Sequence, residues 1–146
     1  MFFSIVIPTY NRLPILQKCL LALEIQTIDS QVISGYEVVV VDDGSTDGTI
    51  EWLQASTVEL PHVKVYEQAH KGASTARNLG VEQAQGDTII FIDSDLVVTA
   101  VFLQSHADAL VKGQQELGND RLFTYGAVIN TANFDHPTAE IGRAHV

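Results

Sequence analysis

The sequence predicts an α/β fold, a three-layer sandwich in which helices cover both faces of a mostly parallel sheet. Short apolar runs alternate along the chain with stretches of helical period, which is the pattern of repeated βαβ units. Two of these runs, Val38–Val41 and Ile89–Ile92, have no polar residue on either face, as in strands that are covered on both sides. The length of 146 residues, 46% of them hydrophobic, suits one domain with its own core.

Each expected strand is a short apolar run bounded by polar or turn residues. The first run lacks the basic flank and the cleavage site of a signal peptide, and its length suits a buried strand. The strands are expected at Ser4–Ile7, Glu37–Val41, Val63–Glu67 and Thr88–Ile92, with a weaker one at Leu122–Ile129.

Four helices are expected between and after these strands. The first runs from Leu13 to Leu23 with leucines at helical spacing, and its proline suits a first turn. The second surrounds Ile50–Leu53, with Ser45 as its expected cap. The others span Ala73–Ala84 and Val101–Leu117, each closed by a following glycine.

The charge balance excludes some functions. The chain has eight Lys and Arg residues and 18 Asp and Glu residues, and the resulting net charge of −10 repels nucleic acid and anionic membranes. A ligand that carries phosphate is therefore expected to need a metal ion. The single Cys19 cannot form an internal disulfide, and no apolar run approaches the ~20 residues of a membrane helix. We expect a soluble, cytoplasmic protein with no nucleic-acid partner and no membrane segment in this chain.

The run Asp93-Ser94-Asp95 directly follows the fourth apolar strand. If the chain stays extended there, both carboxylates point to one side and Ser94 to the other. Two hard oxygen ligands favour Mg²⁺ or Mn²⁺, with water and phosphate in the remaining positions. The alternative is a solvated turn in which one aspartate caps the next helix.

Polar residues also follow the first two strands, and the carboxyl ends of parallel strands meet at one edge. Of the pair Asp42-Asp43, one carboxylate is expected to serve a turn, and the other is free to accept a hydrogen bond from a ligand. Tyr10 could stack on a planar base, although a partly buried loop aromatic is an equal alternative.

The segment Lys71–Asn78 opens the third helix. Gly72 allows close approach of the backbone, and Arg77 can bind a phosphate or pair with the acidic loops. The five histidines, including His70 and His106, show no metal-ligand spacing and are expected at the surface.

Four blocks of the sequence resemble family 2 glycosyltransferases, which have the Rossmann-like GT-A fold. They are Ser4–Arg12, Val40–Thr49, Gly72–Gly80 and Phe91–Asp95, in the order of the family and over about two thirds of the chain. No glycine- and lysine-rich loop follows the first strand, which argues against a sugar nucleotidyltransferase. A receiver-type signalling domain needs a lysine at the end of a later strand, and this sequence has none there. A non-catalytic nucleotide-sugar-binding module remains an alternative.

The resemblance implies a site for a UDP- or GDP-linked sugar. Asp43 is similar to the uracil-binding aspartate of the family, while Asp93 and Asp95 are similar to the two acids of its DxD motif. Arg77 falls where the helix of the family faces the nucleotide. The expected donor-binding residues are Pro8, Thr9, Tyr10, Asp42, Asp43, Gly72, Arg77, Asp93 and Ser94, and the expected metal ligands are Asp93 and Asp95.

The resemblance also implies a metal-dependent transfer with inversion, to an acceptor that is a saccharide, a lipid or a protein. The family's catalytic base lies well beyond DxD, so it is expected beyond the end of this chain, and the chain alone is expected to be inactive. Residues 1–139 then form a partial glycosyltransferase domain, incomplete at its C-terminus. Residues 140–146 match the translation of a common sequencing adapter and are expected to be a non-native tail.

Overall fold

The computed structural model describes residues 1–119 and 121–126. Contacts divide the chain into two compact units, Met1–Ala100 and the part that begins at Val101. No helix in the described part of the chain is long and apolar enough to cross a membrane. The elements are β1 (Phe2–Thr9), α1 (Leu13–Glu24), β2 (Gly35–Asp42), α2 (Thr49–Ala55), β3 (Val63–Glu67), α3 (Ala73–Gln83), β4 (Thr88–Phe91) and α4 (Phe102–Leu117).

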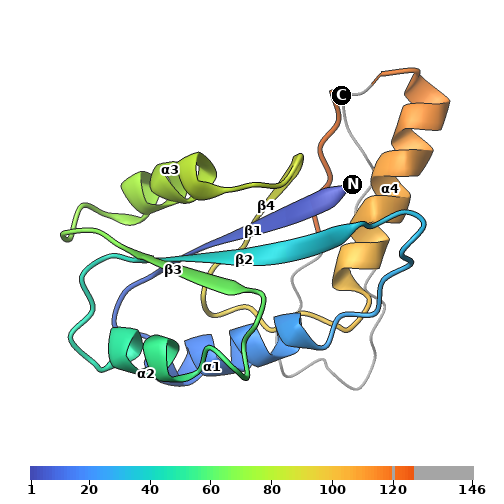
Figure 1. The fold of residues 1–146 in the computed structure, drawn as a ribbon. Helices are drawn as coiled ribbons and strands as arrows, with labels where there is room; N and C mark the ends of the chain where they lie inside the picture. Colours follow the sequence, from blue (N-terminus) through green and yellow to red (C-terminus); the bar gives the residue numbers. More distant parts are fainter. Residues whose placement is uncertain (120, 127–146) are drawn as a thin grey trace, which may run out of the picture. The chain divides into compact units, whose positions relative to one another are not determined.

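The first unit contains a four-stranded sheet in the order β3-β2-β1-β4 (Figure 1). All of its pairings are parallel, with Ile5 of β1 beside Val38 of β2 on one side and Ile90 of β4 on the other. Helix α3 lies on one face of the sheet, and α1 and α2 lie on the opposite face (Figure 1). The predicted three-layer α/β sandwich is confirmed.

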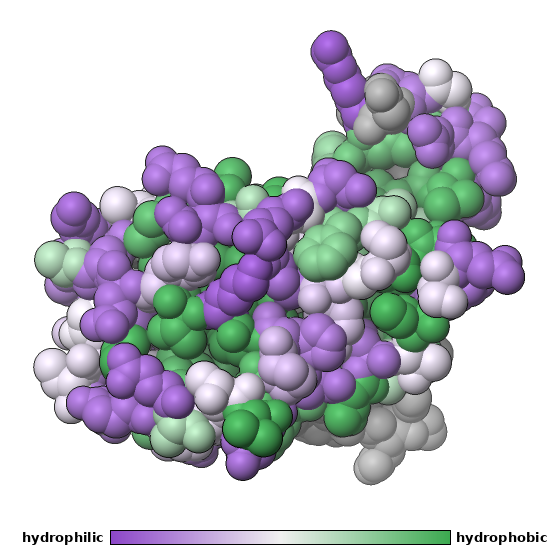
Figure 2. Space-filling model, in the orientation of Figure 1, coloured by the Kyte–Doolittle hydropathy of each residue, from purple (hydrophilic) through white to green (hydrophobic). Residues whose placement is uncertain are grey.

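The core is built around the two inner strands, which are buried on both faces from their second residue onward. Alternate residues of a strand point to opposite faces, so each strand serves two helix layers. Val6, Val39 and Val41 form one buried cluster with Ala76 of α3. A Cβ on Gly80 of α3 would overlap Cγ1 of Val6, so this glycine allows α3 to approach the sheet closely. On the face shown in Figure 2, hydrophilic residues cover much of the surface and apolar residues show between them.

The prediction that Ile89–Ile92 is covered on both faces is wrong. Among the described residues β4 pairs only with β1, and it is one of the two edge strands of the sheet. Its residues are only partly buried, and Phe91 is 52% exposed. The predicted strand at Leu122–Ile129 is also absent over residues 122–126, where Phe123 makes an isolated bridge, and residues 127–129 lie outside the described part.

The helices match their predicted positions to within a few residues, but two predicted caps are wrong. Helix α3 ends at Gln83 with an extended Ala84 as its C-cap, so Gly86 does not close it. Helix α2 begins after Gly48, which has a φ of 87°, and Ser45 does not cap it. The hydroxyl of Ser45 instead accepts a hydrogen bond from the Asn11 backbone N–H in the loop after β1. At the end of α4, Gly118 adopts the left-handed conformation expected of a closing glycine.

Candidate functional site

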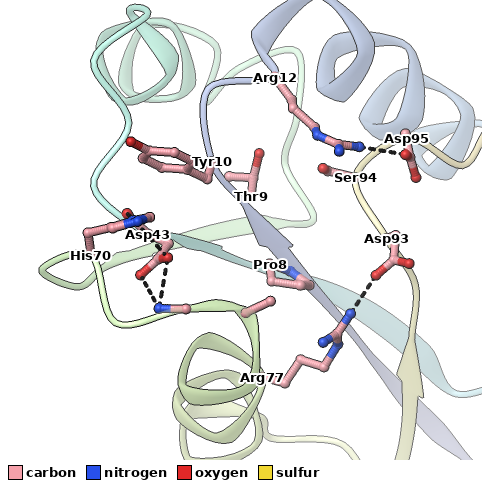
Figure 3. Close-up of a pocket in the computed structure, with 12 residues that line it drawn as sticks. Pro8, Thr9, Tyr10, Arg12, Asp43, His70, Arg77, Asp93, Ser94 and Asp95 are labelled. Atoms are coloured by element: carbon pink, nitrogen blue, oxygen red, sulfur yellow. Dashed lines mark hydrogen bonds and ion pairs between the residues drawn. The ribbon is translucent and has the colours of Figure 1, made fainter.

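A pocket of about 460 Å³ opens at the carboxyl ends of β1, β2 and β4 (Figure 3). It contains nine of the ten residues singled out in the sequence as donor-binding or metal-ligating, and only Asp42 is missing. The lining residues are Pro8, Thr9, Tyr10, Arg12, Asp43, His70, Gly72, Ala73, Arg77, Asp93, Ser94 and Asp95.

Asp42 does not line the pocket and serves a turn. It is 1% exposed, and its Oδ2 accepts hydrogen bonds from the backbone N–H groups of Gly44 and Ser45 at 3.1 and 2.8 Å. This is the Asx-type turn expected for one member of the Asp42-Asp43 pair. Asp43 is therefore the member that reaches the pocket.

Asp43 ties the loop before α3 to the end of β2. Its Oδ1 accepts hydrogen bonds from Gln68 Nε2 at 2.6 Å and from the Lys71 N–H at 2.7 Å, and its Oδ2 accepts one from the Gly72 N–H at 3.0 Å. Asp43 as a whole is only 4% exposed. Loop donors already contact both oxygens, so the carboxylate is not without partners, and its role in binding a ligand stays a prediction.

His70 belongs to the same corner of the pocket, which the sequence analysis missed. Its Nδ1 lies 3.0 Å from the backbone oxygen of Asp43 and 3.1 Å from Oδ2 of that residue. Both are acceptors, so Nδ1 carries a proton. The ring packs on Tyr10 with centroids 4.3 Å apart and a tilt of 34°. Nothing in the pattern of the sequence separates His70 from the other histidines except its position next to Lys71-Gly72.

The hydrogen bonds to Asp43 make the stability of the fold depend on pH. Burial alone would raise the pKa of Asp43, but the bonds from Gln68, Lys71 and Gly72 and the charge of His70 lower it below its usual value. Its contribution is complete above the unfolded pKa of about 3.9 and is lost as the pH falls through the lower folded pKa.

We therefore expect the free energy of unfolding to decrease as the pH is lowered from 5 to 3, measured by urea denaturation at each pH. Other carboxyls with lowered pKa values, among them Asp47 and Asp87, act in the same direction. The variant Asp43→Asn isolates the share of Asp43, and its unfolding free energy should depend less steeply on pH. An equal slope in both proteins would contradict this assignment.

The Asp93–Asp95 run forms the charged end of the pocket. Asp93 Oδ1 pairs with Arg77 at 2.6 Å, and Asp95 Oδ2 pairs with Arg12 at 2.5 Å (Figure 3). Both carboxylates are exposed and Ser94 is buried. The chain does not stay extended, because the Leu96 N–H donates to the Asp93 carbonyl and closes a turn.

The sequence predicts a role for Arg77 but none for Arg12. The ion pair of Arg77 with the acidic loop was one of its two predicted roles, and the structure shows that pair. Arg12 was part of a quoted motif without an assigned role. The signal that would have found it is a lone basic residue beside a strand end, at an edge where carboxylates gather.

The loop that carries Tyr10 and Arg12 is held by the neighbouring loop after β2. Asn11 has a φ of 50°, a conformation that asparagine tolerates better than most residues. Its side-chain Oδ1 accepts a hydrogen bond from the Thr46 N–H at 2.7 Å, and Asp47 accepts one from the Leu13 N–H at 2.9 Å. These bonds fix the backbone on both sides of Arg12.

The donor set of the pocket fits a divalent cation that arrives together with phosphate. In residues 1–119 and 121–126, no three His, Cys, Asp or Glu side chains converge on a metal-sized site. Asp93 and Asp95 supply two exposed carboxylates. Mg²⁺ is commonly bound by one or two carboxylates, with water and substrate phosphates as its other ligands, and these two residues are ligands of that chemical type.

Comparisons with known proteins agree on one family. Residues 4–126 match the model of Glycosyl transferase family 2. The chain is 35% identical over 126 residues to glycosyltransferase AglE of Haloferax volcanii, covering 85% of this chain and 40% of AglE.

Solved structures share the fold. The crystal structure of S. aureus TarS 1-349 in complex with UDP-GlcNAc has a TM-score of 0.67 and 31% identity, covering 78% of this chain and 32% of that one. Mannosyltransferase PcManGT from Pyrobaculum calidifontis is 24% identical with a TM-score of 0.66, which shows a common fold. The chain spans no more than about 40% of the length of these relatives.

Proposed function

Because the chain belongs to glycosyltransferase family 2 and has its GT-A fold, we propose that the pocket binds a nucleoside-diphosphate sugar. The whole protein would then transfer that sugar to an acceptor. TarS, which shares 31% of its residues with this chain over the matched region, was solved with UDP-GlcNAc, and this supports a nucleotide sugar as the ligand.

The observation that carries the proposal is that the pocket has two chemically different ends (Figure 3). Tyr10, Asp43 and His70 form one end, with an aromatic surface and polar groups that suit a nucleoside. The other end holds two arginines and the two aspartates of the DxD run, which suits a diphosphate and a cation.

Two further lining residues suit a bound ligand. The Thr9 hydroxyl is buried, with the residue only 3% exposed, and has no hydrogen-bond partner among the described residues. A buried hydroxyl of this kind is commonly satisfied by water or a ligand. At Gly72, where φ is 92°, a Cβ would meet nothing within 4 Å, so the backbone there is open to close approach.

Asp93 and Asp95 are the residues that would hold Mg²⁺ or Mn²⁺. When bound, such an ion neutralises the charge that develops on the departing nucleoside diphosphate. Arg12 and Arg77 supply further positive charge at the same end, and Asp43 positions the loop that carries His70 and Gly72. We also propose that the transfer inverts the configuration at the sugar carbon, and that the catalytic base and the acceptor site lie outside residues 1–139.

We expect UDP or GDP to bind this chain much more tightly with Mn²⁺ than with a chelator, by at least about tenfold. The reason is that phosphate enters a pocket with three carboxylates. Isothermal titration calorimetry with Mn²⁺ and with EDTA measures the difference. Asp95→Asn should remove the metal effect, whereas Glu59→Gln, the same charge change at an exposed residue outside the pocket, should not. Equal affinity with and without the metal would refute the metal site.

A further inference from the structure

We propose that Arg12 is an exchangeable counter-charge: it pairs with Asp95 in the ligand-free chain and turns to the diphosphate of the donor when Asp95 takes up a divalent cation. This inference rests on the proposed function and assigns Arg12 the task of coupling cation binding to nucleotide binding.

The Arg12–Asp95 ion pair costs little free energy to break. Its NH1···Oδ2 distance is 2.5 Å, but the two side chains are 52% and 46% exposed. An ion pair that faces water contributes little to stability, so its loss costs the fold little. Arg12 lies at the end of the pocket and extends toward Asp95 (Figure 3).

The backbone of Arg12 stays in place while its side chain is free to turn. Its carbonyl accepts hydrogen bonds from the N–H groups of Ile15 and Leu16 in the first turn of α1. The residues on either side, Asn11 and Leu13, are bound to the loop after β2. A guanidinium on a fixed backbone at the pocket edge needs only rotations of its own side chain to move from a carboxylate to a nearby phosphate.

The charges of the pocket favour joint entry of cation and nucleotide. Three carboxylates and two guanidinium groups line it, so the formal charge is −1 with histidine counted as neutral. A divalent cation alone would approach two arginines, and a diphosphate alone would approach three carboxylates. When both enter together, Asp95 turns to the cation and Arg12 to the phosphate, and no group loses its partner.

Such an exchange makes the two binding events cooperative, and cooperativity in binding is reciprocal. Removing Arg12 should therefore act in opposite directions on the two ligands. Asp95 loses its competitor, so the cation alone binds more tightly. The diphosphate loses a partner, so the gain in nucleotide affinity that the cation brings becomes smaller.

The test uses Arg12→Gln in the full 146-residue chain, with Mn²⁺ alone as the probe. Free Mn²⁺ is measured by electron paramagnetic resonance during a titration without nucleotide. The variant should bind Mn²⁺ about threefold more tightly than the wild-type protein, the size expected for loss of one exposed competing charge. Lys18→Gln is the matched control, because it removes an exposed positive charge on α1 outside the pocket, and it should not change the affinity.

A second arm follows UDP by calorimetry with and without Mn²⁺. The ratio of the two affinities should be smaller in Arg12→Gln than in the wild-type protein. Arg12→Lys keeps the charge and should leave Mn²⁺ affinity near the wild-type value, which guards against an effect of misfolding.

An unchanged or weaker Mn²⁺ affinity in Arg12→Gln overturns the exchange, as does failure of both proteins to bind Mn²⁺. Failure of the proposed function has a different signature. In that case the wild-type protein binds neither UDP nor GDP in the presence of Mn²⁺, while the effect of Arg12→Gln on Mn²⁺ alone is still seen.

Discussion

Replacement of Gly80 by alanine is expected to lower the free energy of unfolding by about 2 kcal/mol. Gly80 is buried in α3, and an added Cβ would overlap Cγ1 of Val6 and reach Cγ2 of Val41 at 3.4 Å. Both valines belong to the fully buried cluster beneath the helix, so neither can move without disturbing its neighbours. The overlap outweighs the gain of roughly 1 kcal/mol that alanine brings to a helix interior.

Urea denaturation of single and double variants measures this effect. Val6→Ala removes the methyl group that the new Cβ meets, so Gly80→Ala should cost much less in the Val6→Ala background than in the wild-type protein. Glu82→Ala, at an exposed position of the same helix, is the control for helix propensity. A neutral or stabilising Gly80→Ala would show that α3 lies farther from the sheet than this structure places it.

Asp43→Ala is expected to lower the free energy of unfolding by about 3 kcal/mol, because it removes the acceptor of three partly buried hydrogen bonds. The donors are Gln68 Nε2 and the backbone N–H groups of Lys71 and Gly72. The same change releases the loop that places His70 beside Tyr10, so nucleotide affinity in the presence of Mn²⁺ should decrease by at least about tenfold.

Denaturation and calorimetry on the same preparation separate these two effects. Gln68→Ala is the matched comparison, because it removes one of the donors and leaves both backbone bonds to Asp43 in place. Its loss of stability should be well under that of Asp43→Ala. If the two variants lose the same stability, the backbone bonds of the loop contribute nothing measurable.

The inner part of the sheet is predictable from the sequence because its signal is local. Val38–Val41 is apolar at every position, a pattern that is typical of a strand covered on both faces, and β2 is such a strand. The location of the pocket follows as well, since parallel strands bring their carboxyl ends to one edge. Nine of the ten residues predicted to bind the donor or a metal line this pocket, and they were chosen from their positions at strand ends, from the start of α3 and from the resemblance to the family.

The features that the sequence did not predict depend on contacts between segments that are far apart in the chain. An apolar run such as Ile89–Ile92 does not reveal how many strands flank it, so the edge position of β4 was missed. Ser45 is a suitable helix cap on its own, but its hydroxyl accepts a hydrogen bond from the backbone N–H of Asn11, which lies in another loop. Asp43 looked free because its partners Lys71 and Gly72 lie 28 and 29 residues away.

The strand order also sets the timing of folding. β1 lies between β2 and β4, and Phe3 pairs with Thr88, about 85 positions later in the chain. At a synthesis rate of about 5–20 residues per second, roughly 4–17 seconds separate the appearance of these two partners. During that interval one edge of a strand that is buried in the finished fold has no neighbour and is open to pairing with other chains. The nascent protein is thus most vulnerable to aggregation just before β4 emerges, and molecular chaperones have most to contribute at that stage.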